Sequence, residues 1–235
     1  DRGLVMGRRS FGKGLVQRPM RLPDGSAVRL TVQKYFTPAG RCIQKPYDDG
    51  VETYRKEKFE RYERGEMLSL DSLELPDSLM HATRIQGRPV YGGGGILPDL
   101  FVPIDTTFNS PTFSRILRKG LCSRYALTEV DANREAWEAR HTSEDDFVED
   151  MAFTQDEMAV FKAFVVEEGV ELDDAEWARS LPAIEMRLKA FYGRNIYNSR
   201  TFYRVIGGLN ESLQEATRVL NDGSFKSMNL AHKTF

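Results

Sequence analysis

The sequence predicts a partial, strand-rich α/β domain followed by an all-helical domain. Strand-like runs and the turn formers glycine and proline dominate residues 1–110. From about residue 111 glycine becomes scarce, and apolar residues recur at three- and four-residue steps. The chain has 235 residues, of which 40% are hydrophobic, enough to build two modest domains. We therefore expect an α/β domain at 1–110 and a helical domain at 111–235.

Two strand-like runs open the chain. Residues 4–7 are mostly apolar, and residues 28–36 alternate apolar with polar side chains, which predicts a half-buried strand. Residues 22–26 contain a Pro-Asp-Gly turn signal, which indicates a hairpin into that strand. Residues 37–40 (TPAG) predict the turn that follows it.

Residues 48–88 differ from their surroundings and predict a charged insertion. The run 54–66 is dense in charged and aromatic residues, and we expect a solvated helix or hairpin there. Four glycines at 92–95 then separate the strand-like runs 88–91 and 100–102. They fit either a flexible linker or a close approach of backbones inside a sheet or pocket.

The remaining chain predicts helices with recognisable ends. Thr154 and Glu157 form a capping box that opens an apolar-periodic stretch ending at Gly169. Asp173 or Asp174 caps the next helix. A last helix is expected from near residue 199 to residue 220, stopped by Asn-Asp-Gly at 221–223.

Composition excludes several classes of function. Lys and Arg total 33 against 35 Asp and Glu, and this near balance argues against nucleic-acid binding. No apolar run reaches the roughly 18–20 residues of a membrane helix, so no span is expected. Three scattered histidines and two cysteines, Cys42 and Cys122, suit neither a metal site nor a disulfide framework. Whether these two cysteines pair is left open.

Residues 7–17 (GRRSFGKGLVQ) carry the most specific local motif of the sequence, and two interpretations of its function each lack a residue or a structure that they need. A phosphate-binding loop matches Gly-x4-Gly-Lys, but Gly14 stands where Ser or Thr should hold magnesium. Ser10 and Lys13 match the Ser-x-x-Lys of penicillin-binding enzymes, but Gly12 and Gly14 disfavour the helix that this pair needs.

A third reading makes Lys13 a general base for a serine elsewhere in the chain. A lysine amine activates a serine only when desolvation keeps it partly neutral near pH 7. Lys13 lies between two glycines and near Phe11 and Leu15, an apolar setting that could desolvate it. An exposed turn lysine is the competing reading.

Four segments resemble the C-terminal processing (tail-specific) serine peptidases. Residues 1–17 (DRGLVMGRRSFGKGLVQ) are similar to the lysine motif of that family. Residues 30–44 (LTVQKYFTPAGRCIQ) and 90–99 (VYGGGGILPD) resemble its Thr-Pro-x-Gly-Arg and Gly-Gly-Ile-x-Pro-Asp blocks. Residues 103–107 and the helical tail resemble a branch with a C-terminal extension.

The resemblance implies a crotonase-like α/β peptidase core and a Ser–Lys dyad that needs no metal or cofactor. It makes Lys13 the general base and Gln17 its orienting partner. The family's serine lies about two dozen residues before the lysine, which falls upstream of Asp1, as does a substrate-recognising PDZ domain. We therefore expect a C-terminal fragment that is inactive alone, from a peptidase of the bacterial periplasm or envelope that acts on protein tails.

Two alternatives stay open beside this expectation. The helical tail could act as a non-catalytic interaction or regulatory module, docking a partner or a second copy as a homo-oligomer. The chain could also contain a degenerate phosphate-binding loop, which predicts stabilisation by nucleotide and magnesium.

Overall fold

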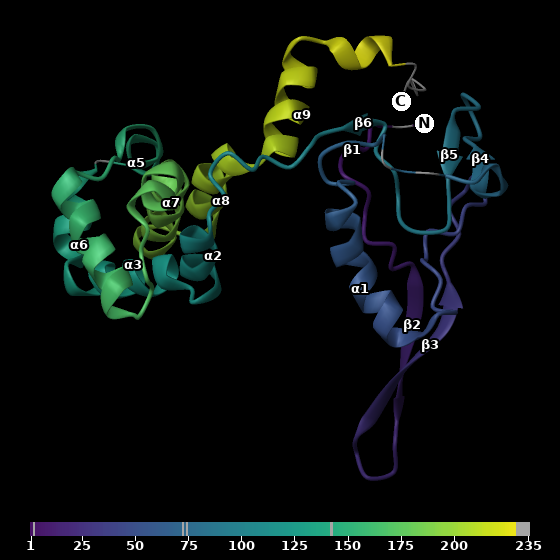
Figure 1. The fold of residues 1–235 in the computed structure, drawn as a ribbon, viewed down its shortest axis with the longest axis horizontal. Helices are drawn as coiled ribbons and strands as arrows, with labels where there is room; N and C mark the ends of the chain where they lie inside the picture. The colour runs from purple at the N-terminus through teal and green to yellow at the C-terminus, as the bar shows by residue number, and fades with distance from the viewer. Residues whose placement is uncertain (2, 72, 74, 142, 229–235) are drawn as a thin grey trace. The chain divides into compact units, whose positions relative to one another are not determined.

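The computed structural model describes residues 1, 3–71, 73, 75–141 and 143–228, which fold into two units (Figure 1). The first unit comprises Asp1–Ile104 and the chain from Glu215 onward, and the second comprises Asp105–Gln214. The first contains all the strands of the described residues, and the second is helical. The expected partial α/β part and helical C-terminal region are therefore confirmed.

A short parallel strand pair ties the two ends of the α/β segment together. Strand β1 (Met6–Gly7) lies beside β6 (Leu100–Phe101), in the register Met6 to Leu100. The Val102 NH then donates to the Gly7 carbonyl at 3.0 Å. Residues 94 positions apart in sequence thus become neighbours, as parallel pairing requires.

The expected hairpin is formed by β2 (Leu15–Arg21) and β3 (Ala27–Lys34). Its turn is closed by Asp24, whose Oδ1 accepts from the Ser26 NH at 3.0 Å and from the Ser26 hydroxyl at 2.7 Å. The second predicted turn is also present, with the Gly40 NH donating to the Thr37 carbonyl.

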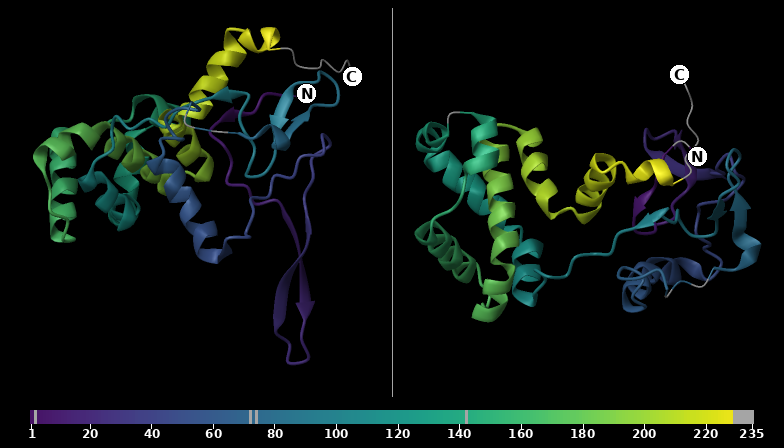
Figure 2. Two further views of the ribbon diagram at one scale, coloured as in Figure 1. Left: turned by 45° about the vertical axis from the view of Figure 1, so that its right-hand side comes forward. Right: turned by 90° about the horizontal axis from the view of Figure 1, so that it is seen from above.

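The expectation that this strand is half buried is wrong. Every residue of β3 is exposed, including the apolar row Val28, Leu30 and Val32, each about half exposed. The reason is visible in Figures 1 and 2, where the hairpin extends away from the rest of its unit. A pattern typical of a strand packed on one face thus occurs in a strand that no described element covers.

The charged insertion forms one helix and a small strand pair. Helix α1 (Gly50–Glu63) resolves the choice between helix and hairpin for residues 54–66. A short 3-10 turn (Asp77–Leu79) follows, and then β4 (Met80–Ala82) pairs antiparallel with β5 (Pro89–Tyr91). These elements bring residues 41–45 and 92–96 close to the start of the chain, as described below.

The α/β segment buries little apolar surface. Among its described residues up to Ile104, Val102 is the one aliphatic or aromatic side chain that is buried. The ring of Pro98 is buried as well. Four of its buried side chains are polar or charged: Gln44, Lys45, Arg61 and Glu66. A segment of about 100 residues normally depends on an apolar core for its stability.

The helical unit, by contrast, has a continuous core. Its helices are α2 (Pro111–Arg118), α3 (Leu121–Ala132), α4 (Arg134–Arg140), α5 (Glu144–Asp150), α6 (Gln155–Glu167), α7 (Asp174–Ile196) and α8 (Ser199–Ile206). The long helix α7 packs against α2, α3 and α8 (Figure 2). Side chains that are fully buried there include Phe147, Phe161, Ile184 and Leu188. Every helix of the described residues is too short or too polar to cross a membrane.

Two of the predicted helices begin as expected. In α6 the Thr154 hydroxyl accepts from the Glu157 NH, and the Glu157 carboxylate accepts from the Thr154 NH at 2.6 Å. After α6, Gly169 has a φ of +74°. The carboxylate of Asp173, one of the two candidates, caps α7 by accepting from the Glu176 NH at 2.8 Å.

The expected single helix from 199 to 220 is wrong. Helix α8 ends at Ile206, a 3-10 turn spans Gly207–Leu209, and α9 runs from Glu211 to Asn221. Gly207 and Gly208 are poor helix formers, and the Asn210 side chain accepts from the Leu213 NH at 3.0 Å, so a new helix begins there. The expected stop is present, because α9 ends at Asn221.

Both cysteines are free thiols. Cys122 is buried in α3 of the helical unit, whereas Cys42 is half buried in the α/β unit.

Candidate active site

Two segments that resemble peptidase motifs lie side by side, although about 80 residues separate them in sequence. We call residues 8–14 the lysine loop and residues 92–96 the glycine segment. The Ser10 NH donates to the Ile96 carbonyl at 2.9 Å, and the Ile96 NH donates to the Ser10 hydroxyl oxygen at 2.9 Å. Ser10 is thus a structural hydroxyl that fixes this contact.

The third motif, at residues 41–45, completes the arrangement. The Lys45 NH donates to the Gly12 carbonyl at 2.8 Å, and the Gly14 NH donates to the Gln44 side-chain oxygen at 2.9 Å. The Gly95 NH donates to the carbonyl of Ile43 at 2.9 Å. The structure therefore brings all three segments together around Lys13.

Glycine is required where these backbones meet. Gly12 has a φ of +89°, and a Cβ there would lie 2.8 Å from the Gly95 nitrogen. A Cβ at Gly95, with a φ of +102°, would overlap the Ser10 carbonyl. Of the two readings of the four glycines, close backbone approach is the one found.

Lys13 itself is exposed, between the buried residues Gly12 and Gly14. Its amine forms no hydrogen bond or ion pair within the described part of the chain, and the expected apolar cover is not present among these residues. Gln17 is also exposed, and its amide donates across the hairpin to the Thr31 hydroxyl at 3.3 Å.

The two readings that need a helix fail on geometry. The lysine loop leads directly into strand β2, which begins at Leu15. A phosphate-binding loop requires a helix N-terminus after its Gly-Lys. A Ser-x-x-Lys pair faces inward only on a helical turn. Neither arrangement is present at Ser10 and Lys13.

A group of five ionic side chains lies next to the lysine loop and was missed by sequence reasoning. We call Arg9, Lys45, Glu57, Arg61 and Glu66 the charge cluster. Arg9 binds Glu66 through two hydrogen bonds of 2.6 and 2.7 Å. Glu57 accepts from the Lys45 ammonium at 2.6 Å and from the Arg61 Nε at 2.8 Å.

Arg61 connects this cluster to the two motif segments. Its side chain is 3% exposed, and its guanidinium donates to the Ser10 carbonyl at 3.0 Å and to the Gly94 carbonyl at 3.1 Å. Helix α1 is thus fixed onto the lysine loop and the glycine segment. The expectation that the run 54–66 is a solvated face is therefore wrong for the face that carries Arg61.

The electrostatics of the cluster favour its ionised form. Burial alone would raise the pKa of Glu57, but hydrogen bonds and charge from Lys45 and Arg61 outweigh it and hold that pKa below its ordinary value. The Lys45 ammonium also lies over the rings of Phe11, at 4.5 Å, and Tyr54, at 3.9 Å. Such contacts stabilise a buried ammonium.

One sequence signal could have identified the face of α1 that carries Glu57 and Arg61. Tyr54, Glu57 and Arg61 occur at i, i+3 and i+7, the spacing of one side of a helix. Glu66 lies beyond the end of the helix, so its pairing with Arg9 depends on tertiary structure.

Comparison with known proteins identifies two parts of the chain. Residues 1–53 match the model of peptidase family S41, which confirms the resemblance to C-terminal processing peptidases. Residues 112–198 match a family of unknown function (DUF8443), which fits a C-terminal extension. The block at 90–99 lies outside the first match, so its family assignment stays a prediction.

Curated relatives agree with the first match. A chloroplastic C-terminal processing peptidase of Tetradesmus obliquus is 57% identical over 44 residues, 19% of this chain and 10% of that protein. A carboxyl-terminal-processing protease of Picosynechococcus is 46% identical over 44 residues, 19% of this chain and 11% of that protein. The carboxy-terminal processing protease CtpB of Bacillus subtilis is 49% identical over 41 residues, 17% of this chain and 8% of that protein.

These alignments span only about a tenth of each relative's length. No solved structure matches the chain.

Proposed function

We propose that residues 1–104 are part of the catalytic core of a C-terminal processing serine peptidase with a crotonase-like α/β fold. The observation that carries the proposal is the convergence of three motif segments around Lys13. Two of them, the lysine loop and residues 41–45, lie in the part of the chain that is similar to such peptidases. The nucleophilic serine and the PDZ domain would come from a segment preceding Asp1. The 235 residues alone would then be inactive.

The physical state of the α/β segment supports its being one part of a larger core. Val102 is its one buried aliphatic side chain among the described residues up to Ile104, and the apolar row of β3 is uncovered. A lone two-stranded hairpin is marginally stable in water. Additional strands packed on this face would bury the row and give the segment the apolar core it needs.

The proposed reaction is hydrolysis of a peptide bond through an acyl-enzyme. The neutral amine of Lys13 takes the proton of the serine hydroxyl as the oxygen attacks the scissile carbonyl. The proton then passes to the leaving nitrogen as the C–N bond breaks. Lys13 then takes a proton from water as the water oxygen attacks the ester carbonyl, and it returns this proton to the serine oxygen as the ester C–O bond breaks. Gln17 would orient the lysine amine, and no metal or organic cofactor takes part.

Lys13 is exposed in the described residues, so the proposal requires the rest of the core to cover it. Covering would desolvate the amine and favour its neutral form. The motif geometry suits this role, because Gly12 and Gly14 are buried while the side chain between them points outward.

The test is peptide hydrolysis by the chain extended upstream through the serine segment. We expect Lys13→Ala to lower kcat/KM by about 10²- to 10⁴-fold. Lys13→Arg should fail equally, because a guanidinium does not deprotonate near neutral pH. Lys34→Ala, at an exposed lysine on the same hairpin, is the matched control. Wild-type rates in a folded Lys13→Ala protein would reject the proposal.

The substrates would be protein tails, and the location would be the bacterial periplasm or envelope. The hydrolysis assay also tests the substrate class, whereas the location is tested by fractionating cells that produce the protein.

A second role for the helical unit is suggested by its surface. Exposed large apolar side chains occur on several of its helices: Leu117, Leu127, Val160, Val166 and Tyr203. We propose that this unit docks a second copy of the chain. Light scattering over a hundredfold range of concentration tests the idea, and a constant monomer mass would reject it.

A further inference from the structure

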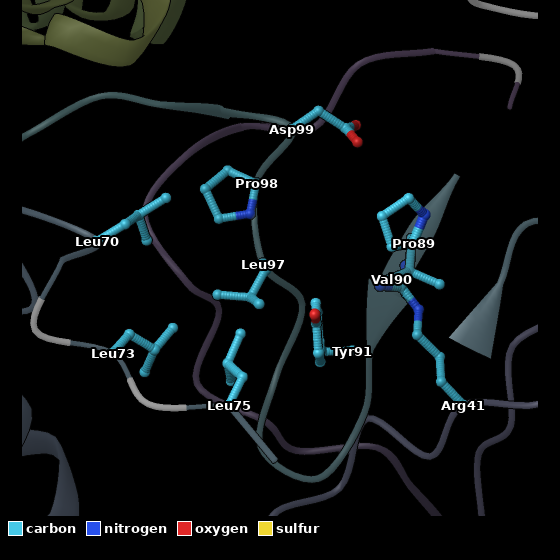
Figure 3. Close-up of a pocket in the computed structure, with 10 residues that line it drawn as sticks. All are labelled: Arg41, Leu70, Leu73, Leu75, Pro89, Val90, Tyr91, Leu97, Pro98 and Asp99. Atoms are coloured by element: carbon cyan, nitrogen blue, oxygen red, sulfur yellow. The ribbon is translucent and has the colours of Figure 1, made fainter. Parts of the chain in front are cut away.

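A small pocket in the α/β unit joins an apolar wall to a charged one. Its volume is about 190 Å³, and its lining comes from the end of the insertion, from strand β5 and from residues 97–99. Figure 3 shows the leucines on one side and Arg41 on the other, with Tyr91 between them. The lining residues are Arg41, Leu70, Leu73, Leu75, Pro89, Val90, Tyr91, Leu97, Pro98 and Asp99.

Arg41 is the unusual group in this pocket. Its Nε is buried without a hydrogen-bond partner, and its guanidinium forms no ion pair with any residue that the structure describes. Burial lowers the pKa of Arg41, although the charge of Asp99 opposes the shift. Burying a donor without a partner costs the free energy of its lost hydration, so buried donors normally form a hydrogen bond.

The nearby carboxylate does not serve as that partner. Asp99 accepts from the Arg88 guanidinium at 2.7 Å and from the Val5 NH at 2.9 Å. Arg88 is held as well, by Asp1 at 2.9 Å. Arg41 is thus a cation available to an anion that enters the pocket from outside this network.

We propose that the leucine-lined pocket binds the C-terminal residue of a peptide, with an apolar side chain against the leucines and the terminal carboxylate on Arg41. Planar guanidinium and carboxylate groups match through paired hydrogen bonds. The volume fits one side chain, because pockets for larger ligands enclose about 300–1,000 Å³. This inference rests on the proposed function, since peptides with free tails are the substrates and products of such a peptidase.

The chemistry argues against an internal acidic residue as the occupant. Aspartate and glutamate carry their carboxylate at the end of the side chain, so they offer no apolar group to the leucine wall. A C-terminal leucine or valine presents both groups from a single Cα.

The experiment is titration of the 235-residue chain with an acetylated tripeptide ending in leucine, as the free acid and as the C-terminal amide. Calorimetry or NMR shifts at residues 89–99 follow binding. We expect the acid to bind about 10- to 100-fold more tightly than the amide, the value of one charge-assisted pairing. Arg41→Gln should remove this difference, and Arg29→Gln, at an exposed arginine of β3, should keep it.

Circular dichroism checks that Arg41→Gln is folded. Arg41→Lys keeps the charge and should therefore retain part of the preference for the acid over the amide. Equal affinity for acid and amide would overturn the inference. So would tighter binding of octanoate than of the peptide, which would identify the site as one for fatty acids.

The binding result is separate from the peptidase test. Lys13→Ala lies outside the pocket and should bind the tripeptide as the wild type does. Peptide binding without hydrolysis by the extended protein would reject the proposed function alone. Hydrolysis without acid-selective binding would reject the pocket alone.

Discussion

A single glycine, Gly95, decides whether the lysine loop and the glycine segment can meet. We expect Gly95→Ala to destabilise the α/β unit by at least about 2 kcal/mol, because its Cβ would overlap the Ser10 carbonyl at a positive φ. Hydrogen exchange at the Ile96 NH, which donates to Ser10, reports this loss. Gly3→Ala, where the added Cβ meets open space, is the control. Unchanged protection in Gly95→Ala would contradict the described contact.

The charge cluster predicts a second effect. Glu57→Gln should destabilise the same unit by about 2–3 kcal/mol, because it leaves the buried Lys45 and Arg61 without a counter-charge. Glu52→Gln, which breaks the exposed pair with Lys56 on the same helix, should cost less than about 0.5 kcal/mol. Denaturant unfolding, monitored by hydrogen exchange in the α/β unit, measures the free energy of unfolding of both variants. Equal effects would mean that the cluster is as solvated as the outer face.

The same carboxylate gives the α/β unit an acid-sensitive stability. The pKa of Glu57 is held below its ordinary value of 4.5, so its contribution is fully present above that value and is lost as pH falls through the folded-state pKa. Hydrogen exchange between pH 3 and 6 should show the α/β unit losing protection at the acid end. Glu57→Gln should flatten that dependence, and a wild-type slope in this variant would contradict the assignment.

At the residue scale, the motif segments could be predicted from the sequence, but the charge cluster that fixes their positions could not. Lys13, Gln17 and the glycines could be found because local patterns carry them. The partners Arg9 and Glu66 are 57 positions apart, and no local pattern links them. An exposed turn lysine was one of the two interpretations of Lys13, and the sequence could not decide between them because the exposure depends on which residues cover the loop.

At the scale of elements, the capping box of α6 makes a testable contribution. Thr154→Ala should destabilise the helical unit by about 1 kcal/mol, since it removes the acceptor for the Glu157 NH. Thr128→Ala, at an exposed threonine within α3, is the matched control. Tryptophan fluorescence during urea unfolding measures both, because Trp137 and Trp177 lie in this unit. Equal midpoints for the two variants would contradict the prediction.

Elements with explicit end signals could be predicted from the sequence, and those decided by tertiary contacts could not. The starts of α6 and α7 and the end of α9 follow from caps and stops that operate within a few residues. The break between α8 and α9 was missed because the Asn-Asp-Gly stop at 221–223 was taken as the end of one helix, although Gly207 and Gly208 disfavour a continuous helix. For β3 the alternation was real, but alternation alone does not supply a covering surface.

At the scale of the whole molecule, the helical unit should be an independent folding unit. Its core residues, from Phe113 to Val205, all lie within Asp105–Gln214. We expect residues 105–214, produced alone, to unfold cooperatively, with a melting temperature within a few degrees of the same transition in the full chain. Calorimetry and tryptophan fluorescence provide the measurement. A broad, non-cooperative transition would show that the unit depends on the α/β segment.

The division into an α/β part and a helical part could be predicted because it follows from composition, which changes near residue 111. The weakness of the apolar core in residues 1–104 could not, because hydrophobic content does not say whether apolar side chains find partners. The side chains of Val28, Leu30 and Val32 are apolar, as in a hydrophobic core, but each is about half exposed.

The two free thiols give each unit its own natural reporter. Burial raises the pKa of the Cys122 thiol to about 12, so an alkylating reagent, which attacks the thiolate, reacts there only when the helical unit opens. Cys42 is half buried in the other unit and needs a smaller opening. Mass spectrometry of a timed alkylation therefore reads the opening rates of both units in one sample, without any substitution to introduce a probe.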